Sequence, residues 1–207
     1  MSELLKIHHE NPERRKLNHI VDKLKQGEII IYPTDTLYAL GCDITNNKAI
    51  ERIARIKGID PKKAKFSIII NDLSHINDYA KPFSNKVYKL MKKNLPGPFT
   101  FILKANNSIP KMLKNNKKTI GIRIPDSIIA MEIVEMLHVP LMSTSIKNIE
   151  DDFIIYPNDP YEIYEEYKHL VDIVIDGGIG GTEPSTVVDC TGSYIDVIRQ
   201  GRGELRE

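Results

Sequence analysis

The sequence predicts a single α/β (α+β) domain built on a mixed β-sheet. β-Branched runs alternate with segments whose apolar residues recur at helical spacing, but without the regular strand–helix–strand rhythm of a purely parallel sheet. No internal repeat or low-complexity linker divides the 207 residues, so we expect one domain over residues 1–207. With 41% hydrophobic residues, the chain can bury roughly 70% of its surface on folding.

A helix and a buried strand are predicted near the start. Asn11 and Pro12 begin a helix that runs through residue 25 with four apolar side chains on one face, and Gly27 ends it. Residues 28–32 form a β-branched strand buried on both faces. Pro33 terminates this strand, because proline cannot donate to a sheet ladder.

The T-D-T loop, residues Thr34-Asp35-Thr36, places two hydroxyls and a carboxylate at the carboxyl end of that strand. Ligands bind at this end of an α/β sheet, so the T-D-T loop is the first candidate site. The alternative is a polar turn whose side chains bond only to backbone.

The middle of the chain predicts helices that alternate with strands. A helix over 48–56 is capped by residues 45–47, and a basic loop over 58–65, a candidate phosphate grip, leads to a strand over 66–70. Ser84 caps a helix through residue 94, and a rigid turn at 95–98 precedes a strand over 99–104. A strand over 119–124 carries Arg123 near its carboxyl end, and we expect Asp126 to cap the next helix.

Hydroxyl side chains recur beside two later strands. Residues 143–145, Ser-Thr-Ser, follow a strand over 139–142, and Ser185 and Thr186 lie beside a strand near 187–189. The alternative is again turn chemistry, since serine and threonine are common in turns. We further expect a surface loop at 150–159, a helix from Asp159-Pro160, and strands over 171–175 and 194–199. The glycine run 177–181 does not open a helix, which excludes a dinucleotide-binding motif.

Composition excludes several classes of protein. No apolar run reaches the roughly 20 residues of a membrane span, and the N-terminus has no apolar signal core. Cys42 and Cys190 match no metal or disulfide spacing, and the six histidines are scattered. We therefore expect a soluble, cytoplasmic protein with no metal site made by the protein alone.

Charge is unevenly distributed along the chain. Residues 48–123 contain 18 Lys and Arg against 4 Asp and Glu, a net charge of +14, whereas residues 150–176 contain 9 acidic residues and 1 basic residue, a net charge of −8. A basic segment of this kind can bind a polyanion such as RNA. The alternative is that the lysines are solvated helix faces.

Six motifs, in order and spacing, resemble the YrdC-like family. They are Y-P-T-D-T-L-Y-A-L-G-C-D at 32–43, P-G-P-F-T at 96–100, G-I-R-I-P at 121–125, S-T-S at 143–145, S-T-V-V-D at 185–189 and V-I-R-Q-G at 197–201. The segment I-H-H-E-N-P-E-R-R at 7–15 is similar to the YciO branch of this family.

This resemblance implies a twisted, open, mixed sheet with flanking helices around a large concave basic cavity. It implies ATP-dependent synthesis of L-threonylcarbamoyladenylate from threonine and bicarbonate, with Mg²⁺ on the ATP and release of pyrophosphate. The product would feed threonylcarbamoylation of tRNA by the threonylcarbamoyl-transferase machinery, and family members are also linked to double-stranded RNA.

The resemblance also assigns roles by motif position. Lys57 and Ser145 would serve catalysis. The amino-acid threonine would be held by Thr34, Thr36 and Arg123, with Ser185 and Thr186 near it. The nucleotide would be bound by Lys57, Ser143, Ser145, Lys147 and Arg199. Lys65, in the basic loop over 58–65, is a further candidate for binding the nucleotide.

Two motifs depart from the synthase branch. Its K-x-R motif is Lys57-Gly58-Ile59 here, and its S-x-N motif is Ser145-Ile146-Lys147. An arginine and an asparagine that hold the triphosphate are therefore replaced. Two functions follow: a nucleotidyltransferase of the threonylcarbamoyladenylate synthase type with weak activity, or a nucleotide- or RNA-binding protein without efficient turnover.

Overall fold

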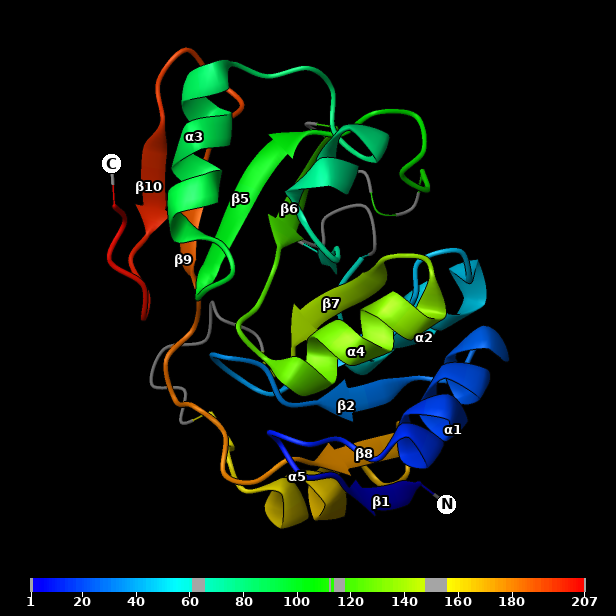
Figure 1. Cartoon of the computed structure of the whole chain (residues 1–207). Helices are drawn as coiled ribbons and strands as arrows, with labels where there is room; N and C mark the ends of the chain where they lie inside the picture. The colour runs from blue at the N-terminus through cyan, green and yellow to red at the C-terminus, as the bar shows by residue number, and fades with distance from the viewer. Residues whose placement is uncertain (1, 61–65, 112, 114–117, 148–155, 207) are drawn as a thin grey trace.

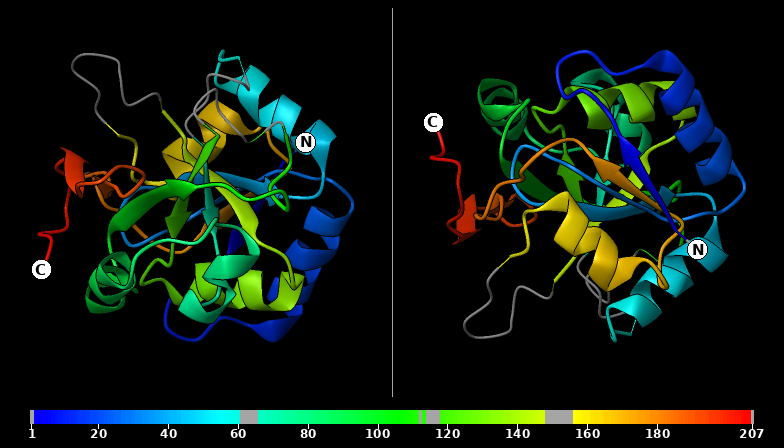
Figure 2. Two further views of the ribbon diagram at one scale, coloured as in Figure 1. Left: turned by 90° about the horizontal axis from the view of Figure 1, so that it is seen from above. Right: turned by 90° about the horizontal axis from the view of Figure 1, so that it is seen from below.

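The structure is a computed structural model that describes residues 2–60, 66–111, 113, 118–147 and 156–206. In these described ranges, ten strands form one mixed sheet with helices on both faces (Figures 1 and 2). The strands are β1 (Glu3–Lys6), β2 (Ile30–Tyr32), β3 (Ala39–Asp43), β4 (Ser67–Ile69), β5 (Phe99–Lys104), β6 (Thr119–Arg123), β7 (Leu141–Ser145), β8 (Ile173–Asp176), β9 (Thr186–Asp189) and β10 (Asp196–Arg199). The helices are α1 (Arg14–Lys25), α2 (Asn47–Ile56), η1 (Leu73–Asp78, a 3₁₀ helix), α3 (Asn85–Asn94), α4 (Ile128–Leu137) and α5 (Pro160–Tyr167).

The strand order across the sheet is β1-β8-β2-β3-β7-β4-β6-β5-β9-β10. Four neighbouring pairs are parallel (β1 with β8, β8 with β2, β4 with β6, and β5 with β9), and the other five are antiparallel. This arrangement confirms the predicted mixed sheet. It also brings β3, β7, β4 and β6 side by side, although they come from distant parts of the sequence.

Strand β2 is buried on both faces, as predicted. Ile31 packs in a core with side chains of α2, α3 and α5, whereas Ile30 and Tyr32 pack on the opposite face with side chains of α1 and α4. Alternate residues of a strand point to opposite faces, so one β-branched run serves both cores. The apolar face predicted for α1 is likewise buried, and α2 and α3 each bury an apolar face as well.

Helix caps confirm most of the predicted helix starts. Asn46, Ser84 and Asp159 each accept a backbone N–H at the start of their helices. The expectation for Asp126 is wrong: the N-cap of α4 is Ser127, whose hydroxyl accepts the Ala130 N–H. The side chain of Asp126 is exposed, and its own N–H donates to another residue.

Three elements have no prediction from the sequence: β1, β3 and η1. Strands β1 and β3 contain no β-branched residue, and β3 includes Gly41, so propensity gives no signal for either. Pairing determines β3, because β2 and β7 hydrogen-bond to its two sides. Helix α1 begins at Arg14 rather than at Pro12, and β7 extends through Ser145, so the Ser-Thr-Ser group lies within the strand.

No helix in the described part of the chain is both long enough and apolar enough to cross a membrane.

Candidate functional site

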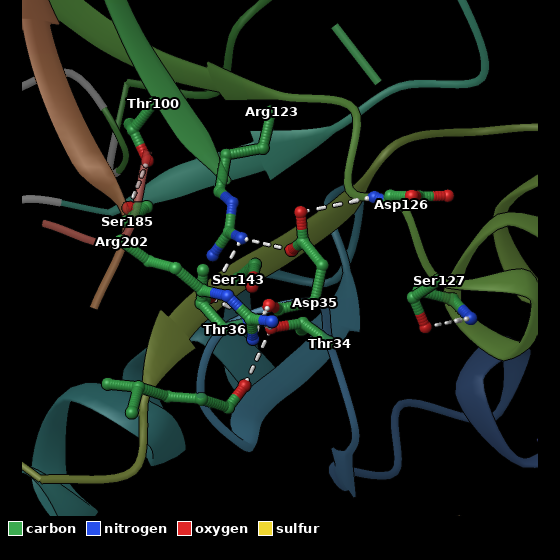
Figure 3. A network of polar contacts seen from close by, with 12 residues as sticks. Thr34, Asp35, Thr36, Thr100, Arg123, Asp126, Ser127, Ser143, Ser185 and Arg202 are labelled. Atoms are coloured by element: carbon green, nitrogen blue, oxygen red, sulfur yellow. Dashed lines mark hydrogen bonds and ion pairs between the residues drawn. The ribbon is translucent and has the colours of Figure 1, made fainter. Parts of the chain in front are cut away.

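The centre of the candidate site is a buried ion pair between the T-D-T loop and β6. Arg123, the last residue of β6, donates from Nη2 to Asp35 Oδ1 at 2.8 Å, and only 9% and 8% of these side chains are exposed. Asp35 Oδ2 accepts the Asp126 N–H at 3.2 Å. Asp35 therefore ties the T-D-T loop to the end of β6 and to the segment that leads into α4 (Figure 3).

The two threonines of the T-D-T loop lie beside this pair. The buried Thr36 hydroxyl accepts a second hydrogen bond from Arg123 Nη2 at 3.0 Å, and Thr34 Oγ1 lies 3.1 Å from Thr36 Oγ1. Arg123 Nε is buried and has no hydrogen-bond partner among the described residues. A buried donor without a partner carries a desolvation cost that a ligand oxygen can relieve.

The glycine run packs against the T-D-T loop. The Tyr38 hydroxyl donates to the Gly178 carbonyl at 2.7 Å and fixes the start of the run. A Cβ on Gly181 would lie 2.0 Å from the Thr36 carbonyl oxygen. Only glycine permits such a close approach of two backbones, so the run shapes the site although it binds no dinucleotide.

Ser185 lies between two further polar side chains. Its hydroxyl is 2.8 Å from Thr100 Oγ1, and Arg199 Nη2 donates to its carbonyl at 2.7 Å and to its hydroxyl at 3.2 Å. Burial lowers the pKa of Arg199, and the nearby positive charge of Arg123 also lowers it. Two guanidinium groups thus share this region with the ion-paired carboxylate of Asp35, which favours the binding of an anion.

Thr186 is fully buried and holds the C-terminal tail, which we define as residues 200–206. Its hydroxyl donates to the Gly203 carbonyl at 2.6 Å and accepts the Gly201 N–H at 3.0 Å. The tail also carries Arg202, whose Nη1 donates to the Asp35 carbonyl at 2.8 Å. Contact between Thr186 and a bound amino acid stays a prediction.

Ser143 is buried within β7. Its hydroxyl is 2.6 Å from the hydroxyl of Tyr32, and burial raises the pKa of Tyr32, so the phenol stays protonated at neutral pH. Ser143 lies near the Arg123 network in Figure 3, but its predicted contact with a nucleotide stays a prediction.

A second group of predicted residues gathers at the ends of α2 and β7. Lys57 Nζ donates to the carbonyls of Ser145 (2.6 Å) and Lys147 (2.9 Å), and Ser145 Oγ donates to the Lys147 carbonyl at 2.7 Å. The Lys147 ammonium pairs with Glu166 of α5. The structure therefore brings Lys57, Ser145 and Lys147 together, but the ammonium of Lys147 points toward α5, where it pairs with Glu166. Lys65 lies outside the described residues.

The described residues offer no Mg²⁺ site of their own. Within the described ranges, no three His, Cys, Asp or Glu side chains gather in a way that could hold a metal ion. Both oxygens of Asp35 already accept hydrogen bonds from the protein. These residues therefore do not fit a resident metal ion.

A cavity of about 360 Å³ lies elsewhere, beside β1 and β8. Charged residues of both signs line it, including Lys23, Arg52, Glu28 and Asp172, but none of the residues assigned a site role by motif position does. The large basic cavity implied by the resemblance stays a prediction.

The structure adds two residues to the site, Thr100 and Arg202, and gives Asp35 an individual role. The sequence predicts Asp35 only as part of the T-D-T loop and predicts no role for Thr100 or Arg202. The position of Thr100 within the P-G-P-F-T motif was the signal for it. No sequence signal points to Arg202, since its contact with Asp35 joins residues 167 positions apart.

Comparison with known proteins gives matches over almost the whole chain. The model of the Sua5/YciO/YrdC family, described as "Telomere recombination", matches residues 22–201. The uncharacterized protein YciO of Escherichia coli strain K12 is 39% identical over 207 residues, which cover 100% of this chain and 98% of that protein. The crystal structure of E. coli YciO matches with a TM-score of 0.92.

Two further matches carry functional names. A putative threonylcarbamoyl-AMP synthase of Methanocaldococcus jannaschii is 36% identical over 203 residues, 97% of this chain and 93% of that protein. The crystal structure of P. abyssi Sua5 complexed with L-threonine matches with a TM-score of 0.87 and 25% identity, over 97% of this chain and 58% of that one. The YciO and Sua5 structures confirm the fold predicted from the sequence.

The close approach of Gly181 to Thr36 leads to a testable prediction. Gly181→Ala places a methyl group against the Thr36 carbonyl, so the T-D-T loop must shift, and we expect unfolding by urea to show a loss of about 1–3 kcal/mol. Gly192→Ala is the matched control, because the nearest atoms to its added Cβ lie 3.8 and 3.9 Å away; it should change stability by less than about 0.5 kcal/mol. Equal stability of the two variants would contradict this account of the glycine run.

Proposed function

The chain belongs to the Sua5/YciO/YrdC family, and on this premise we propose that it is an adenylate-forming enzyme of the threonylcarbamoyl-AMP synthase type. The proposed reaction converts L-threonine, bicarbonate and ATP to threonylcarbamoyl-AMP and pyrophosphate. A relative named putative threonylcarbamoyl-AMP synthase matches 97% of this chain and one named threonylcarbamoyl-AMP synthase matches 96%, which supports the class of activity. The product would serve threonylcarbamoyladenosine modification of tRNA.

Arg123 is the observation that carries this proposal. Asp35 and Thr36 fix one end of its guanidinium, while the buried Nε has no partner among the described residues. A planar guanidinium matches a carboxylate with paired N–H donors. We infer that the carboxylate of an amino acid binds there, with Thr34 and Ser185 as neighbouring hydroxyls. The L-threonine complex of P. abyssi Sua5 supports this choice of ligand.

The proposed reaction has two bond-forming steps. The neutral amine of threonine attacks the carbon of bicarbonate and water is lost, which gives an N-carboxylate. An oxygen of this carboxylate then attacks the α-phosphorus of ATP, the bond to the bridging oxygen breaks, and pyrophosphate leaves. The described residues offer no evident general base, so positioning and charge neutralisation are the protein's contribution. Arg123 orients the amino acid, and Arg199 offsets negative charge on the phosphates.

Lys57 and Ser145 would act at the nucleotide end of the site. In the structure, Lys57 donates to two backbone carbonyls, and the same ammonium can turn to phosphate oxygens when ATP binds. Ser143 and Lys147 complete the nucleotide set by motif position, and Lys65 of the basic loop is a further candidate. Mg²⁺ bound to the ATP phosphates would offset further charge.

The altered motifs support an activity that is present but weak. Ile59 packs against the core and offers no donor where the synthase branch has an arginine. The ammonium of Lys147, which replaces an asparagine, is occupied by Glu166. A flexible ammonium also orients phosphate less well than a guanidinium fork.

The same departures favour the second candidate, a nucleotide- or RNA-binding protein without efficient turnover. Exposed lysines on α3, including Lys86, Lys89 and Lys92, supply part of the basic segment that motivates RNA binding. RNA contact of this kind would rest on phosphates and would fall steeply with salt.

Pyrophosphate release tests the proposed function. We expect the protein to release pyrophosphate from ATP only when threonine and bicarbonate are both present, because the N-carboxylate is the nucleophile. Arg123→Lys should lower kcat/KM for threonine by about 10-fold or more, since it removes the guanidinium fork. Arg206→Lys, in the exposed tail, is the matched control and should have no effect. Release no faster than in a blank without protein, with ATP binding intact, would favour the second candidate.

The altered motifs give a separate prediction. A charged hydrogen bond contributes about 1.5–3 kcal/mol, so the double change Ile59→Arg with Lys147→Asn should raise pyrophosphate release by roughly 10- to 150-fold. The gain should exceed that of either single change, because the restored groups share one triphosphate. No gain in a folded double variant, together with a loss of ATP binding in Lys65→Ala, would show instead that another cation has replaced the arginine.

A further inference from the structure

The C-terminal tail is held firmly beside the candidate site. Asn94, in the last turn of α3, binds the backbone of Arg206 on both sides: its Oδ1 accepts the Arg206 N–H at 2.9 Å and its Nδ2 donates to the Arg206 carbonyl at 2.8 Å. Nearer the site, the Arg202 N–H donates to the Pro184 carbonyl at 2.9 Å. These bonds join the tail to α3 and to the segment before β9. They hold the backbone at Arg202 itself and again at Arg206, four residues later.

The side chain of Arg202 crosses from the tail to the T-D-T loop. Nη1 donates to the Asp35 carbonyl at 2.8 Å, and it also lies close to the position that a Cβ on Gly181 would occupy. Figure 3 shows the guanidinium beside Asp35 and Thr36, on the same network as Arg123. Within the described part of the chain, this is the only hydrogen bond that the Arg202 side chain makes, and the residue is exposed.

Arg202 adds a third positive charge to the region of Arg123 and Arg199. The carboxylate of Asp35 is already satisfied by Arg123 and by a backbone N–H, so Arg202 contacts the loop only through a carbonyl. Arg199 lies near enough to Arg123 for the charge of Arg123 to lower the Arg199 pKa. Three guanidinium groups around one neutralised carboxylate make a site for an anionic ligand that brings its own negative charge.

We propose that Arg202 is a specificity-determining residue that binds an oxyanion of the amino-acid substrate from the tail side of the site. This inference rests on the proposed function. Arg202 is attached to the T-D-T loop, the part of the site assigned to the amino acid. The group of Lys57, Ser145 and Lys147, assigned to the nucleotide, is a separate hydrogen-bonded cluster. Arg199, which is assigned to the phosphates, lies in the same region but is hydrogen-bonded to Ser185, whereas Arg202 is hydrogen-bonded to the T-D-T loop itself. We therefore assign Arg202 to the amino acid rather than to ATP.

Calorimetric titration with L-threonine and, separately, with Mg²⁺-ATP tests the assignment. Arg202→Gln should weaken threonine binding by about 10-fold and leave ATP binding unchanged, because one charged hydrogen bond to the amino acid is lost. Arg202→Lys should retain part of the affinity through its charge. Arg206→Gln is the matched control: it removes the same charge from the same tail, whose contact with Asn94 is made by backbone.

Each other outcome overturns the inference in a distinguishable way. Equal threonine affinity in Arg202→Gln and Arg206→Gln would leave the proposed function standing but would make Arg202 a structural link only. Weakened ATP binding with unchanged threonine binding would make it a phosphate contact. An unmodified protein that binds ATP but no threonine would overturn both this inference and the proposed function. Thermal unfolding of the free variants separates a loosened tail from a lost ligand contact.

Discussion

The arrangement of the site depends on the buried carboxylate of Asp35. The T-D-T loop, the end of β6 and the segment before α4 meet at this carboxylate, and the carbonyl of the same residue accepts a hydrogen bond from Arg202 of the C-terminal tail. A buried ion pair contributes little net stability, because desolvation offsets the attraction, but removing one partner leaves an uncompensated charge. We therefore infer that the Asp35–Arg123 pair fixes the position of the Arg123 guanidinium relative to the T-D-T loop and adds little to the stability of the fold.

This geometry explains how a site is assembled from distant segments. Arg123 lies at the end of a strand that pairs in parallel with β4, and Ser143 lies on β7, on the other side of β4. Ser185 is placed just before β9, which pairs in parallel with β5. The sheet order therefore brings arginine and hydroxyl groups to one region. The glycine run can pack directly against the T-D-T loop because Gly181 has no side chain to clash with the Thr36 carbonyl.

The sequence predicts the centre of this site better than its edges. Pro33 ends a β-branched strand, so the position of the T-D-T loop follows from local rules, and the strand before Arg123 is equally clear. The sequence does not distinguish Asp126 from Ser127 as the cap of α4, because both residue types favour N-caps, and in the structure the Ser127 hydroxyl takes this position. The position of Arg202 depends on how the tail returns past β9, and no local pattern encodes such a long-range contact.

The most direct test of the central claim is a crystal structure of the protein with L-threonine and Mg²⁺-ATP. The account predicts the threonine carboxylate within hydrogen-bonding distance of Arg123, beside Thr34 and Ser185, with the Asp35–Arg123 pair intact. Threonine bound elsewhere, for example in the cavity lined by Arg52 and Asp172, would contradict it, as would an empty Arg123 site at saturating threonine.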